Sequence, residues 1–388
     1  MSRLGSRNIR CIDDLDDLDP EVPVVTLFSG GLDGMYLLHL LAQRRLAKVI
    51  PLAVDLGGNI DQSKIDNVTD AFGFKVCVLE RSQYFAEQFV LPALHAQAVY
   101  LGVHPISASL SRPLIAAEGV ALARDVGAQA LLHTANQSQN TLRRLNGAIT
   151  QLGFIGSFGS PYELSIVSRS HKRDGLAGYG LLTADDHAVS ADSNLWCREF
   201  ESGSLDDPEQ FTVDPSLYLW SAQEADREPL ELTLGFTEGR PVSIDGEPTD
   251  LVRLIDELNR TVGRFGIGRY AGLEQLAAGV KVLEVREMPA AAALLMAYRQ
   301  LESAVVDSEM IREKMSMEQI WTREAVEGRW FGELRSAADA FIGSVARRVT
   351  GSVRLALSAG RLEVTAIRAK DPLYVRDREA WEREITGA

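Results

Sequence analysis

Cysteine is scarce in this chain, with only Cys11, Cys77 and Cys197 in 388 residues. Three cysteines so far apart supply neither a disulfide framework nor the close spacing of a cysteine metal site, and they favour a reducing compartment. Long apolar runs are missing as well, because none approaches the roughly 20 residues that a membrane-spanning helix needs. We therefore expect a cytoplasmic protein that does not insert into a membrane.

Positive charge is the second shortage. The chain has 40 Lys and Arg against 54 Asp and Glu, a net charge of -14. Proteins that bind nucleic acid through its phosphates need the opposite balance, so we expect small molecules and no nucleic acid as partners. Hydrophobic residues make up 46% of the chain, which is ample for a core, and the length suggests two domains.

What the chain does have is a glycine-rich turn, Ser-Gly-Gly-Leu-Asp-Gly at residues 29–34. The apolar residues 24–28 before it predict a buried strand, and the leucine-rich residues 35–45 after it predict a helix. Free backbone N–H groups at such a turn, together with the helix dipole, form a socket for a phosphate group. An ordinary glycine-rich connection is the alternative, but the strand and helix around it favour the phosphate socket.

The spacing of this turn excludes two common nucleotide motifs. No Lys follows the last glycine as in a Walker loop, and one residue between Leu32 and Gly34 does not fit the dinucleotide fingerprint. Instead the turn resembles the PP-loop of ATP pyrophosphatases, which holds the leaving pyrophosphate. The ATP-binding residues that we predict are Ser29, Gly30, Gly31, Leu32, Asp33, Gly34, Val54 and Thr134.

Strand and helix patterns alternate through the first half of the chain. Residues 49–54, 75–79 and 130–133 predict further strands, with helical stretches at about 82–99 and 112–126. This alternation predicts an α/β fold with a parallel sheet and helices on both faces. Ligands of such sheets bind beyond the carboxyl ends of the strands, which would place residues 29–34, 55–58 and 133–140 on one rim.

After residues 155–190, which we expect to be loop, the pattern becomes α+β. Strand patterns and predicted helices at 251–262, 290–303 and 336–348 alternate less regularly there. We therefore divide the chain into an acidic, solvated leader (1–22), a PP-loop ATP-binding domain (23–180), a synthetase domain with an oligomerisation surface (181–377) and a short tail (378–388).

Five motifs in order make the chain resemble argininosuccinate synthase; they lie at residues 28–33, 108–113, 190–196, 201–208 and 265–269. The resemblance implies a carbon–nitrogen ligase that requires ATP and Mg²⁺. In that family the ureido oxygen of citrulline attacks the α-phosphate of ATP, pyrophosphate leaves, and the amine of aspartate then displaces AMP. It also implies a homodimer or homotetramer, and we expect weaker assembly here because the chain lacks the family's long C-terminal arm.

Two residues carry the expected chemistry. The resemblance makes Asp33 the carboxylate on the metal side, with a helix N-cap as its alternative role. Arg112, just before Pro113, could contact phosphate through its guanidinium, with a surface ion pair as the alternative. We assign no set of metal ligands and expect Mg²⁺ to bind together with ATP.

The substrate residues implied by the resemblance are only partly retained. Residue types that match the family's citrulline contacts stand at Ser109, Asn140, Arg144, Ser190 and Glu274. Three others differ: His104 and Arg286 stand where the family has Tyr, and Glu199 where it has Ser. In the family's glycine-rich acceptor run, Asn136 stands for a Thr, Thr141 for an acidic residue, and all three glycines are gone.

These changes lead to a hypothesis of retained adenylation with altered substrates. Glu199 and Arg286 add opposite charges, which either pair with each other or hold the two ends of a different zwitterion. We expect an enzyme that adenylates a ureido or carboxyl oxygen of a small amino-acid-like molecule and couples it to an amine. The alternatives are a true argininosuccinate synthase of arginine biosynthesis, a catalytically silent nucleotide-binding homologue, and a PP-loop enzyme acting on tRNA or deazapurines, which the acidic charge disfavours.

Overall fold

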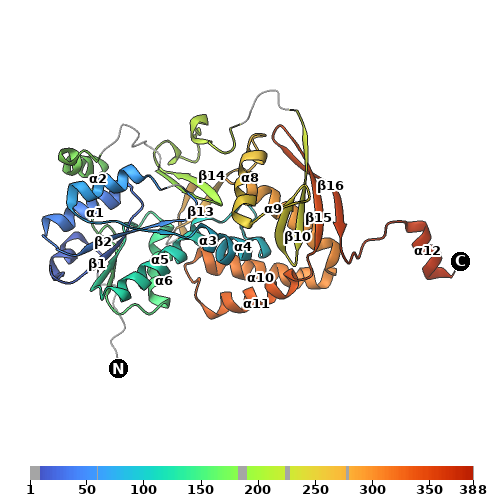
Figure 1. The fold of residues 1–388 in the computed structure, drawn as a ribbon, viewed down its shortest axis with the longest axis horizontal. Coiled ribbons are helices and arrows are strands. Elements are labelled where there is room, and N and C mark those ends of the chain that lie inside the picture. Colours follow the sequence, from blue (N-terminus) through green and yellow to red (C-terminus); the bar gives the residue numbers. More distant parts are fainter. Residues whose placement is uncertain (1–8, 59, 182–189, 223–227, 277–278, 388) are drawn as a thin grey trace.

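The computed structural model describes residues 9–58, 60–181, 190–222, 228–276 and 279–387. The first half is built on a five-stranded sheet in the order β3-β2-β1-β6-β7, with every neighbouring pair parallel. Figure 1 shows it at the left of the molecule. Its strands are β1 (Val24–Leu27), β2 (Val49–Asp55), β3 (Cys77–Glu80), β6 (Ala130–Leu132) and β7 (Ser157–Gly159). The predicted parallel sheet is confirmed, although β7 was not predicted.

Helices cover both faces of this sheet because its strands are apolar on both sides. Val24 of β1 packs with α1 (Leu32–Gln43) and α2 (Gln62–Phe72), whereas its neighbour Val25 packs with the helices of the opposite face. Those are α5 (Ala108–Asp125) and α6 (Asn140–Gln151). Burial on both faces is what the continuous apolar strands of a parallel sheet require.

Two expectations about the first half were wrong. The segment 155–190 is not all loop, because it contains β7 and the helix α7 (Arg169–Leu176), whose Leu176 is buried against the α1 face. The acidic leader is not solvated throughout either. Leu15, in the short 3₁₀ helix Ile12–Asp17, is buried in the same core, so one apolar side of an acidic run is enough to attach it to the body.

The second half carries an antiparallel sheet in the order β12-β11-β10-β15-β16. Its strands are β10 (Leu230–Thr237), β11 (Arg240–Ile244), β12 (Glu247–Pro248), β15 (Gly351–Ser358) and β16 (Arg361–Ala369). Four helices accompany it: α8 (Leu251–Gly263), α9 (Pro289–Val305), α10 (Ser308–Val326) and α11 (Glu333–Ala346). The predicted α+β character is confirmed. Helix α10 was not predicted, because charged residues along its length obscure the apolar periodicity.

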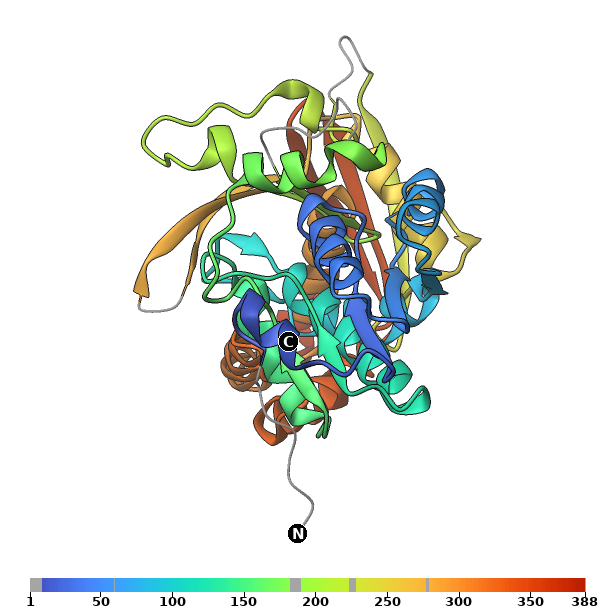
Figure 2. The ribbon, with the colours of Figure 1, turned by 90° about the vertical axis from the view of Figure 1, so that its left-hand side faces the viewer.

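A third sheet, β13-β14-β9-β8, supplies much of the wall that faces the parallel sheet. It is antiparallel and consists of β8 (Ser190–Asn194), β9 (Cys197–Glu201), β13 (Arg269–Gln275) and β14 (Lys281–Glu287). Figure 2 shows the β13–β14 hairpin as an orange arm that extends from the body. The two-stranded pair β4 (Val99–Tyr100) and β5 (His104–Pro105) lies beside β13.

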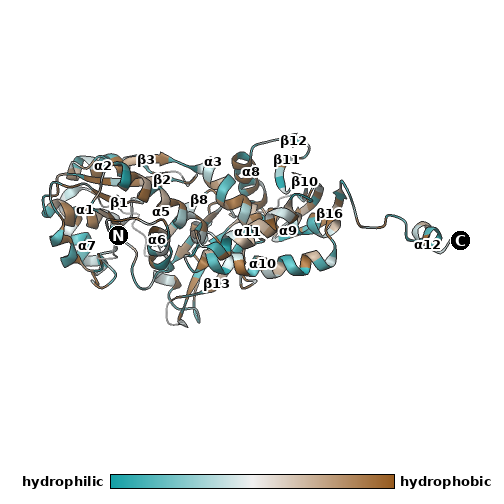
Figure 3. Ribbon diagram, turned by 90° about the horizontal axis from the view of Figure 1, so that it is seen from below, coloured by the Kyte–Doolittle hydropathy of each residue, from teal (hydrophilic) through white to brown (hydrophobic). Residues whose placement is uncertain are grey.

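The remaining helices are α3 (Ser82–Phe85), α4 (Leu91–His95) and α12 (Arg378–Thr386). Every residue of α12 is exposed, and Figures 1 and 3 both show this helix apart from the body. Within the ranges given above, no helix has both the length and the apolar character needed to cross a membrane.

His95, at the end of α4, gives the fold a predicted pH dependence. Its Nε2 lies 3.1 Å from the Gly239 carbonyl oxygen, and burial lowers its pKa to about 4. The unfolded chain takes up this proton near pH 6.5 and the folded chain only near pH 4, so stability is lost as the pH falls between those values. We expect the free energy of unfolding in urea to be about 2 kcal/mol lower at pH 5 than at pH 7.5 through this residue.

The matched variants for this prediction are His95→Gln and His171→Gln. His95→Gln removes the buried titrating group and should flatten the pH dependence, whereas His171 is exposed on α7 and its replacement should leave the dependence unchanged. Equal pH profiles for wild type and His95→Gln would contradict the prediction.

Candidate active site

A cavity of about 610 Å³ opens where the parallel sheet meets the third sheet. The glycine turn 29–34 lines it, together with residues that follow β2 and β6, including Asp55, Gly58 and Thr134. The three segments that we expected on one rim therefore share one cavity. This follows from the topology, since parallel strands bring all their carboxyl ends to the same edge.

The geometry of the turn suits an anion. Gly30 has a φ of +76°, a conformation that other residues rarely adopt, and Gly31 is the N-cap of α1. The first N–H groups of α1 have no carbonyl acceptor in a preceding turn, so they are available at the cavity. Because Gly31 holds the cap position without a side-chain hydrogen bond, the alternative role of Asp33 as the N-cap is wrong.

Asp33 has a partner that the sequence analysis missed. Lys172 of α7 places its Nζ 2.7 Å from Asp33 Oδ1 and 4.6 Å from the ring centre of Tyr162. The Tyr162 hydroxyl in turn donates to the Asp33 carbonyl oxygen at 3.0 Å. The carboxylate beside the glycine turn is thus already neutralised by a lysine that is only 8% exposed.

Close approach of two segments brings β8 to the cavity. A Cβ atom on Gly58 would lie 2.3 Å from the carbonyl oxygen of Ser193, so only glycine lets the end of β2 touch β8. Nearby, the Leu195 amide donates to the Leu56 carbonyl at 2.9 Å. This contact sets Asp192 of β8 opposite α5.

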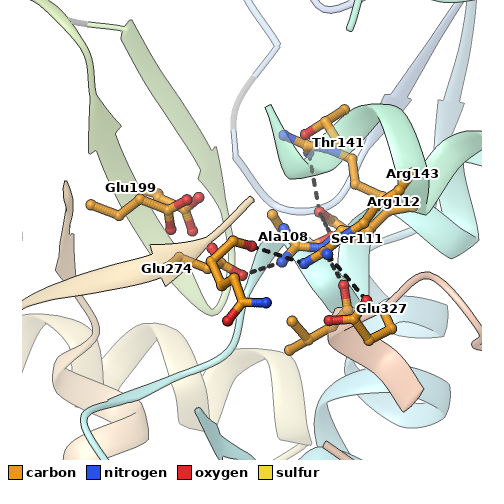
Figure 4. Close-up of polar contacts among 12 residues, drawn as sticks. Ala108, Ser111, Arg112, Thr141, Arg143, Glu199, Glu274 and Glu327 are labelled. Carbon is orange, nitrogen blue, oxygen red and sulfur yellow. Dashed lines mark hydrogen bonds and ion pairs between the residues drawn. The ribbon is translucent and has the colours of Figure 1, made fainter. Parts of the chain in front are cut away.

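Arg112 links three elements across the cavity. Its Nη2 lies 2.8 Å from Asp192 Oδ2, and its Nε donates to Thr141 Oγ1 at 3.3 Å. Figure 4 shows Arg112 on α5 with Thr141 on the neighbouring helix. The ion pair therefore lies in the cavity wall. Thr141, where the resembling family has an acidic residue, accepts a hydrogen bond from Arg112 and adds no negative charge.

The other predicted substrate residues divide into two groups. Asn140, Thr141, Arg144, Ser190 and Glu199 line the cavity. Five lie outside its lining, namely His104, Ser109, Asn136, Glu274 and Arg286. Of these, Ser109 is buried within α5, and Asn136 Oδ1 accepts from the Ser138 amide at 3.0 Å in a local turn. His104 is buried, and burial followed by the charge of Arg286 lowers its pKa to about 3.

Behind the cavity wall lies a buried network of ion pairs. Arg286 Nε is 2.9 Å from Glu199 Oε2, and its Nη2 is 3.3 Å from Glu274 Oε2 and also bonds Glu284. Arg144 bonds Glu274 and donates from Nε to the Val326 carbonyl at 3.1 Å. Of the two possibilities for the new charges, Glu199 and Arg286 pair with each other. Figure 4 shows Glu199 and Glu274 on strands that face Arg112.

Burial and charge shift the pKa values of three carboxyl groups at this site, Glu201, Glu274 and Glu284. Burial and the neighbouring Glu199 and Glu274 carboxylates raise the pKa of Glu284 well above its usual value. Burial and Glu199 also raise the pKa of Glu201, although Gln139 Nε2 donates to Glu201 Oε1 at 3.1 Å. Burial opposes ionisation of Glu274 as well, but Arg144 and Arg286 outweigh it and lower the pKa.

The sequence analysis missed four charged residues of the site, namely Lys172, Asp192, Glu201 and Glu284. Asp192 and Glu201 stand inside two of the quoted motifs, so the motifs could have identified them. Lys172 and Glu284 had no such signal. Their positions depend on how α7 packs on α1 and how β14 pairs with β9.

The sequence Ser-Gly-Gly-Leu-Asp-Gly, placed between β1 and α1 at the carboxyl edge of a parallel sheet, identifies a PP-loop nucleotide-binding protein. The match to known families agrees. A model of the arginosuccinate synthase N-terminal HUP domain matches residues 23–154, and a model of the arginosuccinate synthase C-terminal domain matches residues 189–386. The chain belongs to the argininosuccinate synthase family, as the five motifs predicted, and is an AMP-forming carbon–nitrogen ligase that uses ATP.

Individual relatives extend over most of the chain. It is 34% identical over 368 residues to the argininosuccinate synthase of Rubrobacter xylanophilus, which covers 94% of this chain and 90% of the relative. The enzyme of Symbiobacterium thermophilum is 34% identical over 365 residues, covering 92% and 91%. Among solved structures, the NH3-dependent NAD synthetase from Campylobacter jejuni aligns with 44% of this chain and 70% of its own at a TM-score of 0.30 and 14% identity.

Proposed function

We propose that this ligase adenylates a ureido or carboxyl oxygen of a small amino-acid-like molecule other than citrulline, or couples it to an amine other than that of aspartate. The buried pair between Glu199 and Arg286 carries the proposal. These residues stand where the family pattern has Ser and Tyr. Their network forms the wall behind the substrate end of the cavity, by which we mean the part lined by Asn140, Thr141, Arg144 and Glu199. A wall with new charges selects a ligand with different charges.

The phosphate end supports retained adenylation. The amides at residues 30–34 and the N-terminal dipole of α1 would stabilise the pyrophosphate as its negative charge develops. We assign these contacts to Ser29, Gly30, Gly31, Leu32 and Gly34. Arg112 also lines the cavity and would contact the α-phosphate of ATP. This phosphate is the group that the ureido or carboxyl oxygen of the substrate attacks.

Magnesium is expected to arrive with ATP. In the described parts of the chain, no three His, Cys, Asp or Glu side chains converge on a metal position. This fits Mg²⁺ held mainly by phosphates and one or two carboxylates, for which Asp33 on the cavity wall is our candidate. The ion would spread the negative charge of the triphosphate.

The residue at position 141 supports an attacking amine other than that of aspartate. An acidic residue at position 141 could attract the ammonium group of an incoming amino acid, whereas Thr141 is a neutral acceptor for Arg112. Removing one member of a desolvated charge pair typically costs about 2–5 kcal/mol of binding. An amine that needs no such carboxylate is therefore favoured over aspartate.

ATP–pyrophosphate exchange tests the function directly. Purified protein is screened with Mg-ATP, labelled pyrophosphate and single amino acids or ureido compounds. We expect exchange with one small molecule and none with RNA. Synthesis of argininosuccinate from citrulline, aspartate and ATP at an ordinary turnover of about 1–1000 per second would overturn the altered-substrate proposal. Nucleotide binding without any exchange would favour a silent homologue.

Lys172 gives a sharper prediction for the ATP site. In Lys172→Met the phosphate socket loses the cation that lies beside Asp33, so the triphosphate meets one positive charge fewer. We expect the dissociation constant of Mg-ATP, measured by calorimetry, to rise about tenfold, which corresponds to about 1.4 kcal/mol. Lys172→Arg keeps the charge and should bind nearly as wild type. An unchanged affinity in Lys172→Met would show that the pair does not serve the nucleotide.

A further inference from the structure

The arginines at the substrate end of the cavity all have carboxylate partners. Arg112 pairs with Asp192, Arg144 with Glu274, and Arg286 with Glu199, Glu274 and Glu284. A ligand carboxylate that enters this end meets guanidinium groups whose charge is already compensated. At Arg144 and Arg286 it would have to displace a protein carboxylate from a buried pair, which is strongly unfavourable.

Carboxylates outnumber the arginines here. The five carboxylates are Asp192, Glu199, Glu201, Glu274 and Glu284, against three arginines. Glu199, Glu201 and Glu284 line the cavity itself. Burial is the first cause of the raised pKa values of Glu201 and Glu284, and the neighbouring buried carboxylates raise them further.

A separate observation shows that this end is built to hold a polar ligand. Asn140, the first residue of α6, is 5% exposed and lines the cavity. Neither its amide nitrogen nor its amide oxygen has a hydrogen-bond partner in the part of the chain that the structure describes. Leaving such a buried amide unpaired is unfavourable, so a bound molecule should supply both a donor and an acceptor.

We propose that the substrate bound at this end presents a cationic group, a primary ammonium or an amidinium, to Glu201, and carries no α-carboxylate there. Asn140 hydrogen-bonds the polar part of the same molecule. The inference rests on the proposed function, which it narrows from amino-acid-like substrates to amines. A cation compensates the excess carboxylates, whereas the carboxylate of an amino acid adds to them.

Three probes that share a ureido group and differ in their charged groups test the proposal. Citrulline is a zwitterion, 4-ureidobutylamine is the same molecule without its carboxylate, and butylurea carries no charge. Binding of each to the full chain is measured by calorimetry with α,β-methylene-ATP and Mg²⁺ present. We expect 4-ureidobutylamine to bind at least tenfold more tightly than either of the other two. Binding of the amine no tighter than butylurea, or tighter binding of citrulline, overturns the proposal.

Variants assign the preference to named carboxylates. Glu201→Gln should reduce the preference for the amine over butylurea by at least fivefold. Asp206→Asn removes an exposed carboxylate five residues away in the same chain segment and outside the cavity, so it should leave the preference unchanged. The double variant Glu199→Ser/Arg286→Tyr, which restores the family's residue types, should shift binding towards citrulline. An equal loss in Glu201→Gln and Asp206→Asn would contradict the assignment.

The binding readout separates this inference from the proposed function. If the amine is preferred but no compound supports ATP–pyrophosphate exchange, the ligase proposal fails and the cation site stands. If citrulline supports exchange and no preference for the amine is found, the cation site fails while the ligase activity stands.

Discussion

Valine at position 30 is expected to reduce the affinity for Mg-ATP by at least about a hundredfold. Gly30 has a φ of +76°, and a β-branched residue cannot adopt this conformation without strain. The turn would rearrange, and its amides would no longer converge on the phosphates. Each charge-assisted hydrogen bond contributes about 1.5–3 kcal/mol, so the loss of two exceeds a hundredfold. Calorimetric titration of Gly30→Val with Mg-ATP measures the effect.

Gly127 offers a matched control for the backbone strain. It follows α5, has a φ of +64°, is exposed, and has no atom within 4 Å of a Cβ placed on it. Gly127→Val should therefore carry a similar strain away from the cavity and keep the ATP affinity of the wild type. If both variants lost ATP binding equally, general destabilisation would explain the result and the role of the turn would be in doubt.

Replacing Arg286 by leucine is expected to have the largest effect on stability. Its guanidinium is buried among Glu199, Glu274 and Glu284, and leucine leaves these carboxylates without their common cation. Breaking a buried ion pair from one side costs about 3–5 kcal/mol. With an unfolding entropy of about 2 cal/mol/K per residue, the thermal midpoint should fall by about 4–6 °C.

The pH dependence gives this second prediction an internal check. Without Arg286 the buried carboxyl groups favour their protonated forms in the folded state, so their pKa values rise above those of the unfolded chain. The deficit of Arg286→Leu should then be smallest at pH 5 and grow towards pH 8, as measured by the thermal midpoint. Arg260→Leu, which breaks only exposed pairs with Asp256 and Glu257 on α8, should shift the midpoint by about 1 °C or less. A deficit for Arg286→Leu that is independent of pH would contradict the electrostatic origin.

The two predictions test different physical effects, backbone geometry at the phosphate end of the cavity and buried charge at the substrate end. The phosphate end depends on backbone geometry at a few glycines, supported by the Lys172–Asp33 pair beside them. The substrate end depends on charges held by the third sheet and by α5 and α6, where one substitution changes the balance of the whole network. Under the proposed function, this difference lets adenylation be retained while the substrate wall diverges.

The sequence was sufficient to predict the features that depend on residues close together in the chain. The strands β1, β2, β3 and β6 were predicted because apolar, β-branched runs form buried parallel strands wherever helices cover both faces. The turn at residues 29–34 followed from its strand–glycine–helix order alone. The family was evident from five motifs because each consists of neighbouring residues whose order survives divergence.

The sequence by itself determined the fold class, the phosphate turn and the family of this protein. Only the tertiary structure decided which charges neutralise each other. Lys172 and Asp33 are 139 positions apart, and Arg286 and Glu199 are 87 apart, so neither pair leaves a local pattern. They meet because α7 packs against α1 and because β14 pairs with β9. Ion pairing falls off within a few ångströms, and the packing of whole elements sets such distances.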